Sequence, residues 1–380
     1  ANVLLFLGRM QDHAGKAREA EASFARAVRE EPGNAAARIR LASQLCRRLE
    51  YPAAAEHFSA AERILRAERN LEGLTELLMA RGVLRSQTVA ESRKDLEEAE
   101  ALAAQTGNRY HRLSLRFRRA RLLQVEKDYD GAAAISRETA EEARREGLQS
   151  VAAQALGELG NALRMARQLD RAVATLREAV VFAEEVKSYS TLAANRMRLG
   201  EALLHLERRE EAVSHMRPAV DWYRQAGMRD VLPEVLIKYG TVHPRLQDRR
   251  PLYEEALALA TEQGDTAYQA MALQRLTADL SHRDTRSAVQ HGRRLLPLAR
   301  AVPNHTAMLA VAEVMSDYGL AEEARQIAAE VGAAVERYPR GVDRDGHLGR
   351  LRQFHMESAR HAGDCETAVR FYRSNSAGYP

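Results

Sequence analysis

The sequence repeats itself at intervals of about 40 residues, and this periodicity restricts the chain to a stack of similar units. Glycines that are expected to end helices recur at spacings of 40, 80 and 37 residues, at Gly107, Gly147, Gly227 and Gly264. Glycine is favoured there because the residue after a helix often adopts a left-handed conformation in which a β-carbon clashes. The interval of 80 spans two units, and Lys187-Ser188 is expected to make the intervening turn less tightly.

A second set of marks, small residues inside the units, repeats with a related period. The first two are 34 residues apart and the last three are 40 apart, at Gly8, Ala42, Gly160, Gly200 and Gly240. A small residue at this place lets the two helices of one unit approach closely. Between the marks, apolar residues recur every three or four positions, as at Leu156, Leu159 and Leu163, which indicates helices and not strands. The sequence therefore predicts an all-α chain built from helix pairs.

The marks of the first unit resemble the tetratricopeptide repeat (TPR) signature, with Leu7, Gly8, Gly15, Ala20, Phe24, Ala27 and Pro32 in its order and spacing. The resemblance covers essentially the whole chain. It implies a right-handed α-solenoid, a TPR superhelix, that forms a single domain over residues 1–380. About ten helix-turn-helix repeats are expected, approximately 1–34, 35–70, 71–108, 109–148, 149–188, 189–228, 229–265, 266–303, 304–340 and 341–380.

Repeats of about 40 residues are most similar to those of MalT-like bacterial regulators, Rap-type peptide sensors and LGN-type adaptors. Those proteins use the repeats to hold another protein or a peptide, so the resemblance implies a binding function. Pentatricopeptide repeats, which bind RNA, have a similar length but lack the small marks found here. The basic clusters also lack interleaved aromatic residues, so nucleic acid is not the expected partner.

Composition agrees with a folded chain that does not cross a membrane. Hydrophobic residues make up 45% and charged residues 29% of the sequence, and the mean hydropathy is −0.45. Charges occur in every stretch of twenty residues, which excludes a transmembrane helix. The two cysteines, Cys46 and Cys365, are too few for a disulfide framework or a zinc site, so a reducing cytoplasm is the expected compartment.

The first helices of successive repeats are expected to line a concave face, and their register indicates which residues lie there. Counted from the start of each unit, the sixth position carries Phe6, Arg40, Ala80, Arg118, Glu158, Arg198, Lys238 and Arg275, of which five are basic. The fifth position supplies apolar residues. Guanidinium groups bind carboxylates in a bidentate manner, so this groove suits a partner that carries acidic groups. The candidate partner-binding residues are Arg40, Phe117, Arg118, Arg121, Asn161, Arg164, Met197, Arg198, Lys238 and Arg275.

Two simpler explanations of the basic row remain open. Arginine is abundant, with 52 arginines against five lysines, so some basic positions would align by chance on a solvated face. Ion pairs with Glu158, Glu201 and Glu234 would also engage much of the row within the chain. Cys46 likewise has two interpretations, because the adjacent arginines would activate a thiolate whereas a small residue also suits the packing seam.

Catalytic motifs are absent from the sequence. It contains no nucleophile elbow, no phosphate-binding loop and no His-Glu-x-x-His pair, and no cofactor or metal is expected. Asp343 and Asp345 superficially suggest a calcium loop, but the closing position is Phe354 and not glutamate.

The sequence therefore predicts a non-enzymatic scaffold for a protein or peptide, the interaction arm of a bacterial signalling or transcription-regulatory protein. One alternative is a ligand-responsive sensor module of a larger ATPase or transcription activator. The other is a self-associating structural subunit that stacks through the tail at 374–380.

Overall fold

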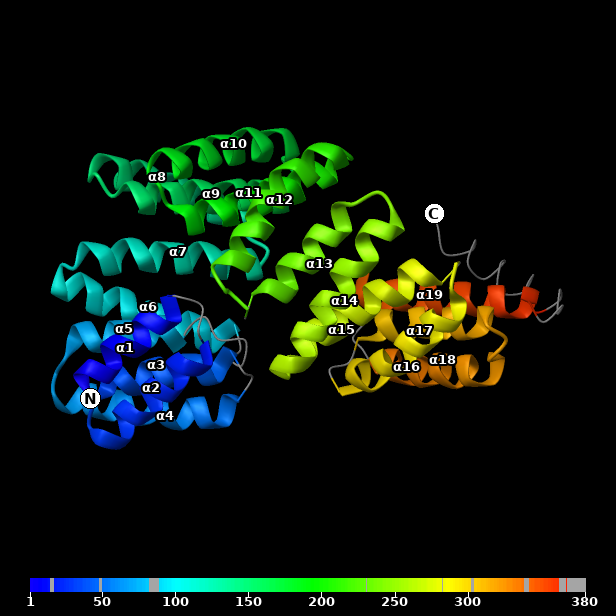
Figure 1. The fold of residues 1–380 in the computed structure, drawn as a ribbon, viewed down its shortest axis with the longest axis horizontal. Coiled ribbons are helices and arrows are strands. Elements are labelled where there is room, and N and C mark those ends of the chain that lie inside the picture. Colours follow the sequence, from blue (N-terminus) through cyan, green and yellow to red (C-terminus); the bar gives the residue numbers. More distant parts are fainter. Residues whose placement is uncertain are drawn as a thin grey trace. The chain divides into compact units, whose positions relative to one another are not determined.

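The computed structural model describes residues 1–13, 17–47, 50–81, 89–229, 231–281, 283–301, 304–337, 342–361 and 367. Over these residues the chain forms nineteen α-helices and no strand, and the fold is an all-α solenoid of TPR-like helix pairs (Figure 1). The predictions made for Gly15, Cys365 and the tail at 374–380 lie outside the described residues.

The helices divide into two compact units, 1–244 and 245–380. The first unit holds α1 (Asn2–His13), α2 (Ala17–Glu30), α3 (Ala35–Arg47), α4 (Tyr51–Ala67), α5 (Leu71–Arg81), α6 (Val89–Thr106), α7 (Arg109–Val125), α8 (Tyr129–Arg145), α9 (Gln149–Met165), α10 (Leu169–Glu185), α11 (Tyr189–His205), α12 (Arg209–Gln225) and α13 (Leu232–Val242). The second unit holds α14 (Leu246–Gln263), α15 (Thr266–Leu280), α16 (Thr285–Ala301), α17 (His305–Asp317), α18 (Ala321–Val335) and α19 (Val342–His361). The division of 1–380 into ten repeats of one solenoid stays a proposal.

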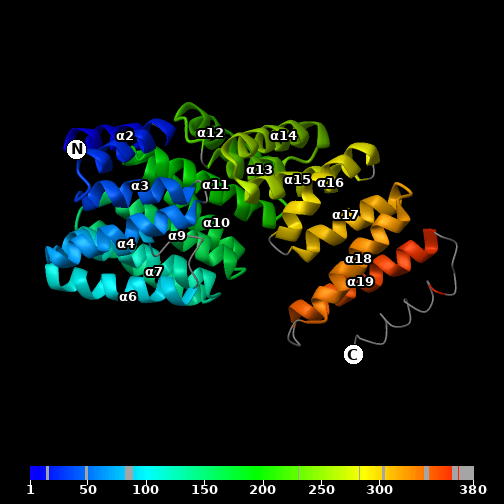
Figure 2. The same ribbon diagram turned by 90° about the horizontal axis from the view of Figure 1, so that it is seen from below.

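Within the first unit, the odd-numbered helices form a continuous layer. Each helix packs against its neighbours in sequence, and α3, α5, α7, α9, α11 and α13 also contact one another in succession. We call these six helices the inner layer. In the second unit α17, α18 and α19 lie side by side in the same way (Figure 2). Each inner-layer helix therefore contacts both its neighbours in sequence and the inner-layer helices of the adjacent repeats.

The small marks lie where two helices of a pair come closest. A β-carbon at Gly160 would overlap the side chain of Leu176, and one at Gly200 would overlap Met216. Gly8 faces Phe24 in the first pair in the same manner. The packing reason inferred from the sequence is thus confirmed at three repeats.

The helix-ending residues adopt the left-handed conformation that their spacing predicts. At Gly147 the φ angle is +73°. Lys187 has φ +53°, its amide donates to the carbonyl of Glu184, and the amide of Ser188 donates to that of Ala183. The same hydrogen-bond pattern surrounds Gly147, so the expectation of a looser turn at Lys187 was wrong. The backbone hydrogen bonds impose this turn even where the side chain adds strain.

Candidate partner-binding surface

Three positions of each inner-layer helix share one face because they are three and seven residues apart. With the small mark counted as position eight, these are positions six, nine and thirteen. We call the surface that they form on α7 to α13 the inner face. It carries Arg118, Arg121, Val125, Glu158, Asn161, Met165, Arg198, Glu201, His205, Lys238 and Thr241. Side chains of adjacent helices meet across it, as the ion pairs described next show.

On α9, α11 and α13 the basic residues of the inner face are neutralised by carboxylates. Arg198 pairs with Glu158 of the preceding repeat. Arg164 Nη2 lies 3.2 Å from Glu201 Oε2, and Lys238 Nζ lies 2.8 Å from Glu201 Oε1 and 3.0 Å from Glu234 Oε1. Three cations thus face three carboxylates, and we call this set the charge lattice. The ion-pair explanation raised from the sequence is confirmed for these residues.

The lattice also determines the protonation of Lys238. Burial alone would lower the pKa of its ammonium group, but the carboxylates of Glu201 and Glu234 outweigh burial and raise the pKa above its usual value. Lys238 is therefore a charged residue held in place by the protein.

Asn161 is similarly engaged with its neighbours. Its amide nitrogen donates to Gln124 Oε1 at 2.7 Å, and its carbonyl oxygen accepts from Arg164 Nη2 at 2.7 Å. A partner's backbone would have to displace one of these bonds to reach the side chain. Asn161 thus connects α7 to the charge lattice.

The inner face of α7 differs because its two arginines have no partner among the described residues. Arg116 and Arg119, which lie on other faces of α7, form ion pairs with Glu142 and Glu100. Arg118 is half-buried; burial, and then the charge of neighbouring Arg121, lowers its pKa to about 10. The pair is an electropositive spot without a counter-ion in the described part of the chain.

The inner face of α7 and α9 also carries two exposed apolar side chains that the sequence analysis does not predict. Val125 is 65% exposed and Met165 is 37% exposed, and both occupy position thirteen, on adjacent helices of the inner layer. The signal was available, since each lies seven residues after a predicted inner-face residue. The sequence instead predicts apolar contacts at the fifth position, and this prediction is wrong because Met197 at that position is buried.

Residues at the fifth position face the core. Met197 is buried, as are Ile39, Met79 and Ile237, and half-buried Phe117 packs against the core cluster that contains Ala140 and Leu156. A residue one place before position six is turned about 100° around the helix, towards the neighbouring repeat. Of the remaining candidates, Arg40 is exposed on α3 and Arg275 is exposed on α15 of the second unit.

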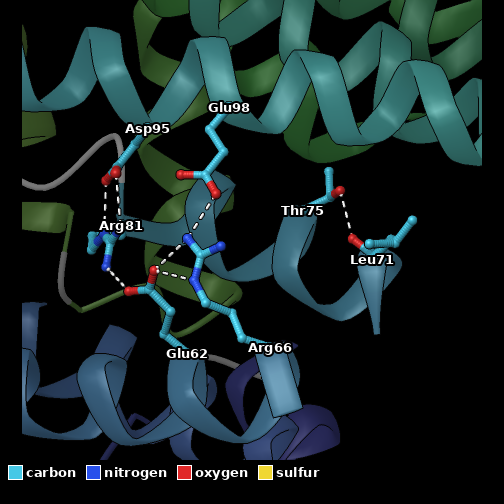
Figure 3. A network of polar contacts seen from close by, with 7 residues as sticks. All are labelled: Glu62, Arg66, Leu71, Thr75, Arg81, Asp95 and Glu98. Atoms are coloured by element: carbon cyan, nitrogen blue, oxygen red, sulfur yellow. Dashed lines mark hydrogen bonds and ion pairs between the residues drawn. The ribbon is translucent and has the colours of Figure 1, made fainter. Parts of the chain in front are cut away.

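A second group of charges, on α4, α5 and α6, is engaged within itself (Figure 3). Arg81 donates to both carboxylate oxygens of Asp95 at 2.8 Å and to Glu62 at 2.6 Å. Arg66 joins Glu62 to Glu98, with 2.7 Å to each. The network joins α4, α5 and α6. Its Arg81–Asp95 pair is bidentate and mostly withdrawn from water, which strengthens the contact.

Cys46 is a packing residue of the seam between helices. It is buried, and burial raises the pKa of its thiol to about 11, so the interpretation as a reactive thiolate was wrong.

In the described part of the chain, no cluster of three or more histidine, cysteine or acidic residues could hold a metal ion. None of the helices there is long and apolar enough to span a membrane.

Comparison with known proteins places the fold but does not identify a family. No protein-family model matches the sequence, and no curated protein matches it either. Among solved structures, a Rap protein in complex with the competence and sporulation factor has a TM-score of 0.50 at 14% identity, covering 90% of this chain and 96% of that one. Aspartyl phosphate phosphatase F from Bacillus subtilis gives 0.53 at 14% identity, with 89% and 96% covered.

A signal-transduction ATPase with a tetratricopeptide repeat sensor, from Pyrococcus horikoshii, gives a TM-score of 0.55 at 11% identity, covering 95% of this chain and 55% of that one. At these identities the likeness concerns the fold alone. The chain is a TPR-like repeat protein whose helix arrangement resembles that of Rap-type arrays.

Proposed function

We propose that the chain is a scaffold that binds a protein or peptide segment on its inner face, with Arg118 and Arg121 as the anchor for an acidic group. The observation that carries the proposal is the difference in charge balance along this face. The lattice on α9 to α13 is neutral, whereas Arg118 and Arg121 on α7 form no ion pair with any carboxylate of the described residues. A carboxylate from a partner would supply the missing charge.

The chemistry of the surrounding surface defines the segment further. Arg121 and Val125 are four residues apart on one helix, which places their β-carbons about 6 Å apart. Met165 extends the apolar surface onto α9. A segment with a carboxylate next to an apolar side chain matches both features at once. Burial of the apolar part would exclude water from the ion pair and strengthen it.

The solved structures support the proposal at the level of the fold. One of them is a Rap protein in complex with the competence and sporulation factor, so this helix arrangement can hold a regulatory factor. We further propose that the chain is a cytoplasmic regulatory scaffold of a bacterium, and the lack of catalytic motifs in its sequence supports a role without enzymatic activity. The acidic nature of the partner rests on the charges of this chain alone.

The test is a selection from a displayed library of random peptides, with the wild-type chain and an Arg118→Glu/Arg121→Glu variant as baits. We expect wild type to enrich peptides that combine an acidic and an apolar residue, and the variant to lose them. The matched control is Arg137→Glu/Arg145→Glu, which makes the same charge change at two exposed positions of α8. Enrichment of the same peptides by wild type and by the Arg118/Arg121 variant would contradict the proposal.

A second candidate is a sensor module within a larger ATPase or transcription activator. It is favoured by the likeness to the ATPase with a repeat sensor. This chain matches 55% of the length of that ATPase. In that case the same inner face would bind the signal. Expression of the complete gene product and assay of its ATP hydrolysis with and without a selected peptide would decide between the two candidates.

A further inference from the structure

The turns at the two ends of the inner-layer helices use different residues in the left-handed conformation. In the turns that lead into α7, α9 and α13 this residue is a glycine, at Gly107, Gly147 and Gly227, and in the turn into α11 it is Lys187. In the turns that follow α7, α9 and α11 it is always charged, at Lys127, Arg167 and Glu207, with φ of +65°, +62° and +60°. We call these three residues the turn edge. Glycine adopts this conformation without strain, so the turns themselves do not require these side chains.

Arg167 is the residue of the turn edge that offers a free positive charge. Lys127 lies between Glu126 and Asp128 in the sequence, and Glu207 is itself acidic. Arg167 is exposed, and it forms no ion pair with any carboxylate of the described residues. Its guanidinium group is therefore available to a partner.

Arg167 lies next to the apolar part of the inner face. It follows Met165 by two residues, at the end of α9. Its charge also acts on His205 of α11, where burial, and then the charges of Arg164 and Arg167, lowers the pKa of the imidazole. Because His205 and Met165 both occupy position thirteen of adjacent inner-layer helices, Arg167 borders the same row of side chains.

The repeat geometry gives the distance from Arg167 to the unpaired arginines of α7. Arg121 is at position nine of α7 and Arg167 is at position fifteen of α9, which separates them by about 9 Å along the helix axis. Adjacent helices lie up to about 10 Å apart, so the direct separation is about 13 Å. The exposed side chains of Val125 and Met165, at position thirteen, lie between the two arginines. An extended chain rises about 3.3 Å per residue and therefore spans this distance with four residues.

We infer that the partner segment is extended and carries two acidic residues four positions apart, with an apolar residue midway between them. The inference rests on the proposed function, in which Arg118 and Arg121 bind the first acidic residue. The second acidic residue binds Arg167, and the apolar one contacts Val125 and Met165. Alternate residues of an extended segment project from the same face, so all three side chains meet the protein together.

The first test determines the pattern of the peptides that wild type enriches in the library selection. We expect two acidic residues four positions apart around a central apolar residue. One such peptide is then synthesised, and its dissociation constant is measured by fluorescence anisotropy in about 50 mM salt, where ion pairs are screened less than at physiological salt. Arg167→Gly should raise this constant about threefold or more. The variant should melt no lower than wild type, because glycine suits the turn.

The matched control is Lys187→Gly. It removes a cation from the same left-handed conformation, at φ +53°, and should also melt no lower than wild type. Lys187 precedes α11, a helix of 17 residues, and so lies about 25 Å from the turn edge. We expect the dissociation constant of the peptide to stay unchanged.

A second test exchanges the charges of the contact. Arg167→Glu is combined with a peptide in which lysine replaces the second acidic residue. Glu207 occupies the same turn one repeat later, so the backbone accepts a glutamate there. Each change alone should weaken binding, and the combination should restore it.

The outcomes separate this inference from the proposed function. Enriched peptides with a single acidic residue, an unchanged dissociation constant for Arg167→Gly, or no restoration by the charge exchange would overturn the inference. The proposed function would still hold in those cases if binding required Arg118 and Arg121. A wild-type chain that enriches no peptides with acidic and apolar residues would overturn both.

Discussion

The inner faces of α7 and of α9 to α13 have the same register but opposite charge balance. Arg198 and Lys238 occupy the same position as Arg118, yet both are held by carboxylates whereas Arg118 has none in the described structure. A basic residue at a groove position is therefore not by itself a binding residue. Whether it can bind a partner depends on the residue that the neighbouring repeat places beside it.

Stability measurements distinguish the two kinds of arginine best. Removal of a paired arginine and removal of an unpaired one should change the free energy of unfolding with opposite signs. Removal of a paired, desolvated guanidinium leaves a carboxylate without a counter-ion, so the free energy of unfolding falls. Removal of an unpaired, half-buried guanidinium ends the desolvation penalty of its charge, so the free energy of unfolding rises. Three arginine substitutions test this difference, from the largest expected effect to the smallest, and a histidine on the same face follows them.

The largest loss is expected for Arg81→Met, which removes the cation from the network on α4 to α6. Asp95, whose side chain is 8% exposed, would keep its charge without its bidentate partner. We expect the free energy of unfolding to fall by about 3 kcal/mol in chemical denaturation. Arg66→Met, at a side chain that is 48% exposed, should cost about 1 kcal/mol or less, and equal losses for the two would contradict this assignment.

The lattice arginine comes next. Arg198→Gln leaves Glu158, at 12% side-chain exposure, without its cation, and should lower the free energy of unfolding by about 2 kcal/mol. Arg275→Gln removes an exposed arginine from the same position of α15 and is expected to change it by less than about 0.5 kcal/mol. Equal changes in the free energy of unfolding for the two variants would show that the charge lattice does not contribute to stability.

Arg118→Gln should have the opposite sign. Burial lowers the pKa of Arg118 to about 10, below its value in the unfolded chain, so the charged form is disfavoured by folding. This cost is fully present at pH 7, and stability would rise only as the pH increases above about 10. Removal should therefore raise the free energy of unfolding by about 1 kcal/mol, a modest value because solvent screens the half-exposed charge. A loss comparable to that of Arg198→Gln would show that Arg118 has a partner within the chain.

The smallest effect concerns His205, at position thirteen of α11. Burial, followed by the charges of Arg164 and Arg167, lowers the pKa of its imidazole below the usual 6.5. The unfolded chain then binds the proton more readily, so wild-type stability should fall as the pH decreases below 6.5. His205→Gln should lose this component, by less than about 1 kcal/mol between pH 7 and pH 5. Parallel pH profiles of the two proteins would contradict the assignment.

The sequence predicted the fold because its determinants are local. Gly147 and Gly227 end helices, Gly160 and Gly200 permit close helix contacts, and these marks can be found without knowledge of any partner residue. The turn at Lys187 shows the limit of this approach. Its left-handed backbone follows from hydrogen bonds and not from residue type.

The candidate binding surface was less predictable because its charge balance depends on pairs of residues that are far apart in sequence. Arg198 meets Glu158 from 40 residues away, and Arg164 meets Glu201 from 37 away. A helical wheel could have found the apolar part of this face, because position thirteen, exposed at Met165, lies about 20° from position six, whereas position five, buried at Met197, lies about 100° from it.

In the proposed function, a partner's carboxylate neutralises Arg118. A double-mutant cycle with a selected peptide measures this contact, with Arg118→Gln combined with replacement of the peptide's acidic residue by its amide. We expect a coupling free energy of about 1 kcal/mol or more between the two changes in calorimetric titration. Arg40→Gln, at an exposed site on α3, should show no coupling. Additive effects of Arg118→Gln and the peptide change would show that the carboxylate does not bind Arg118.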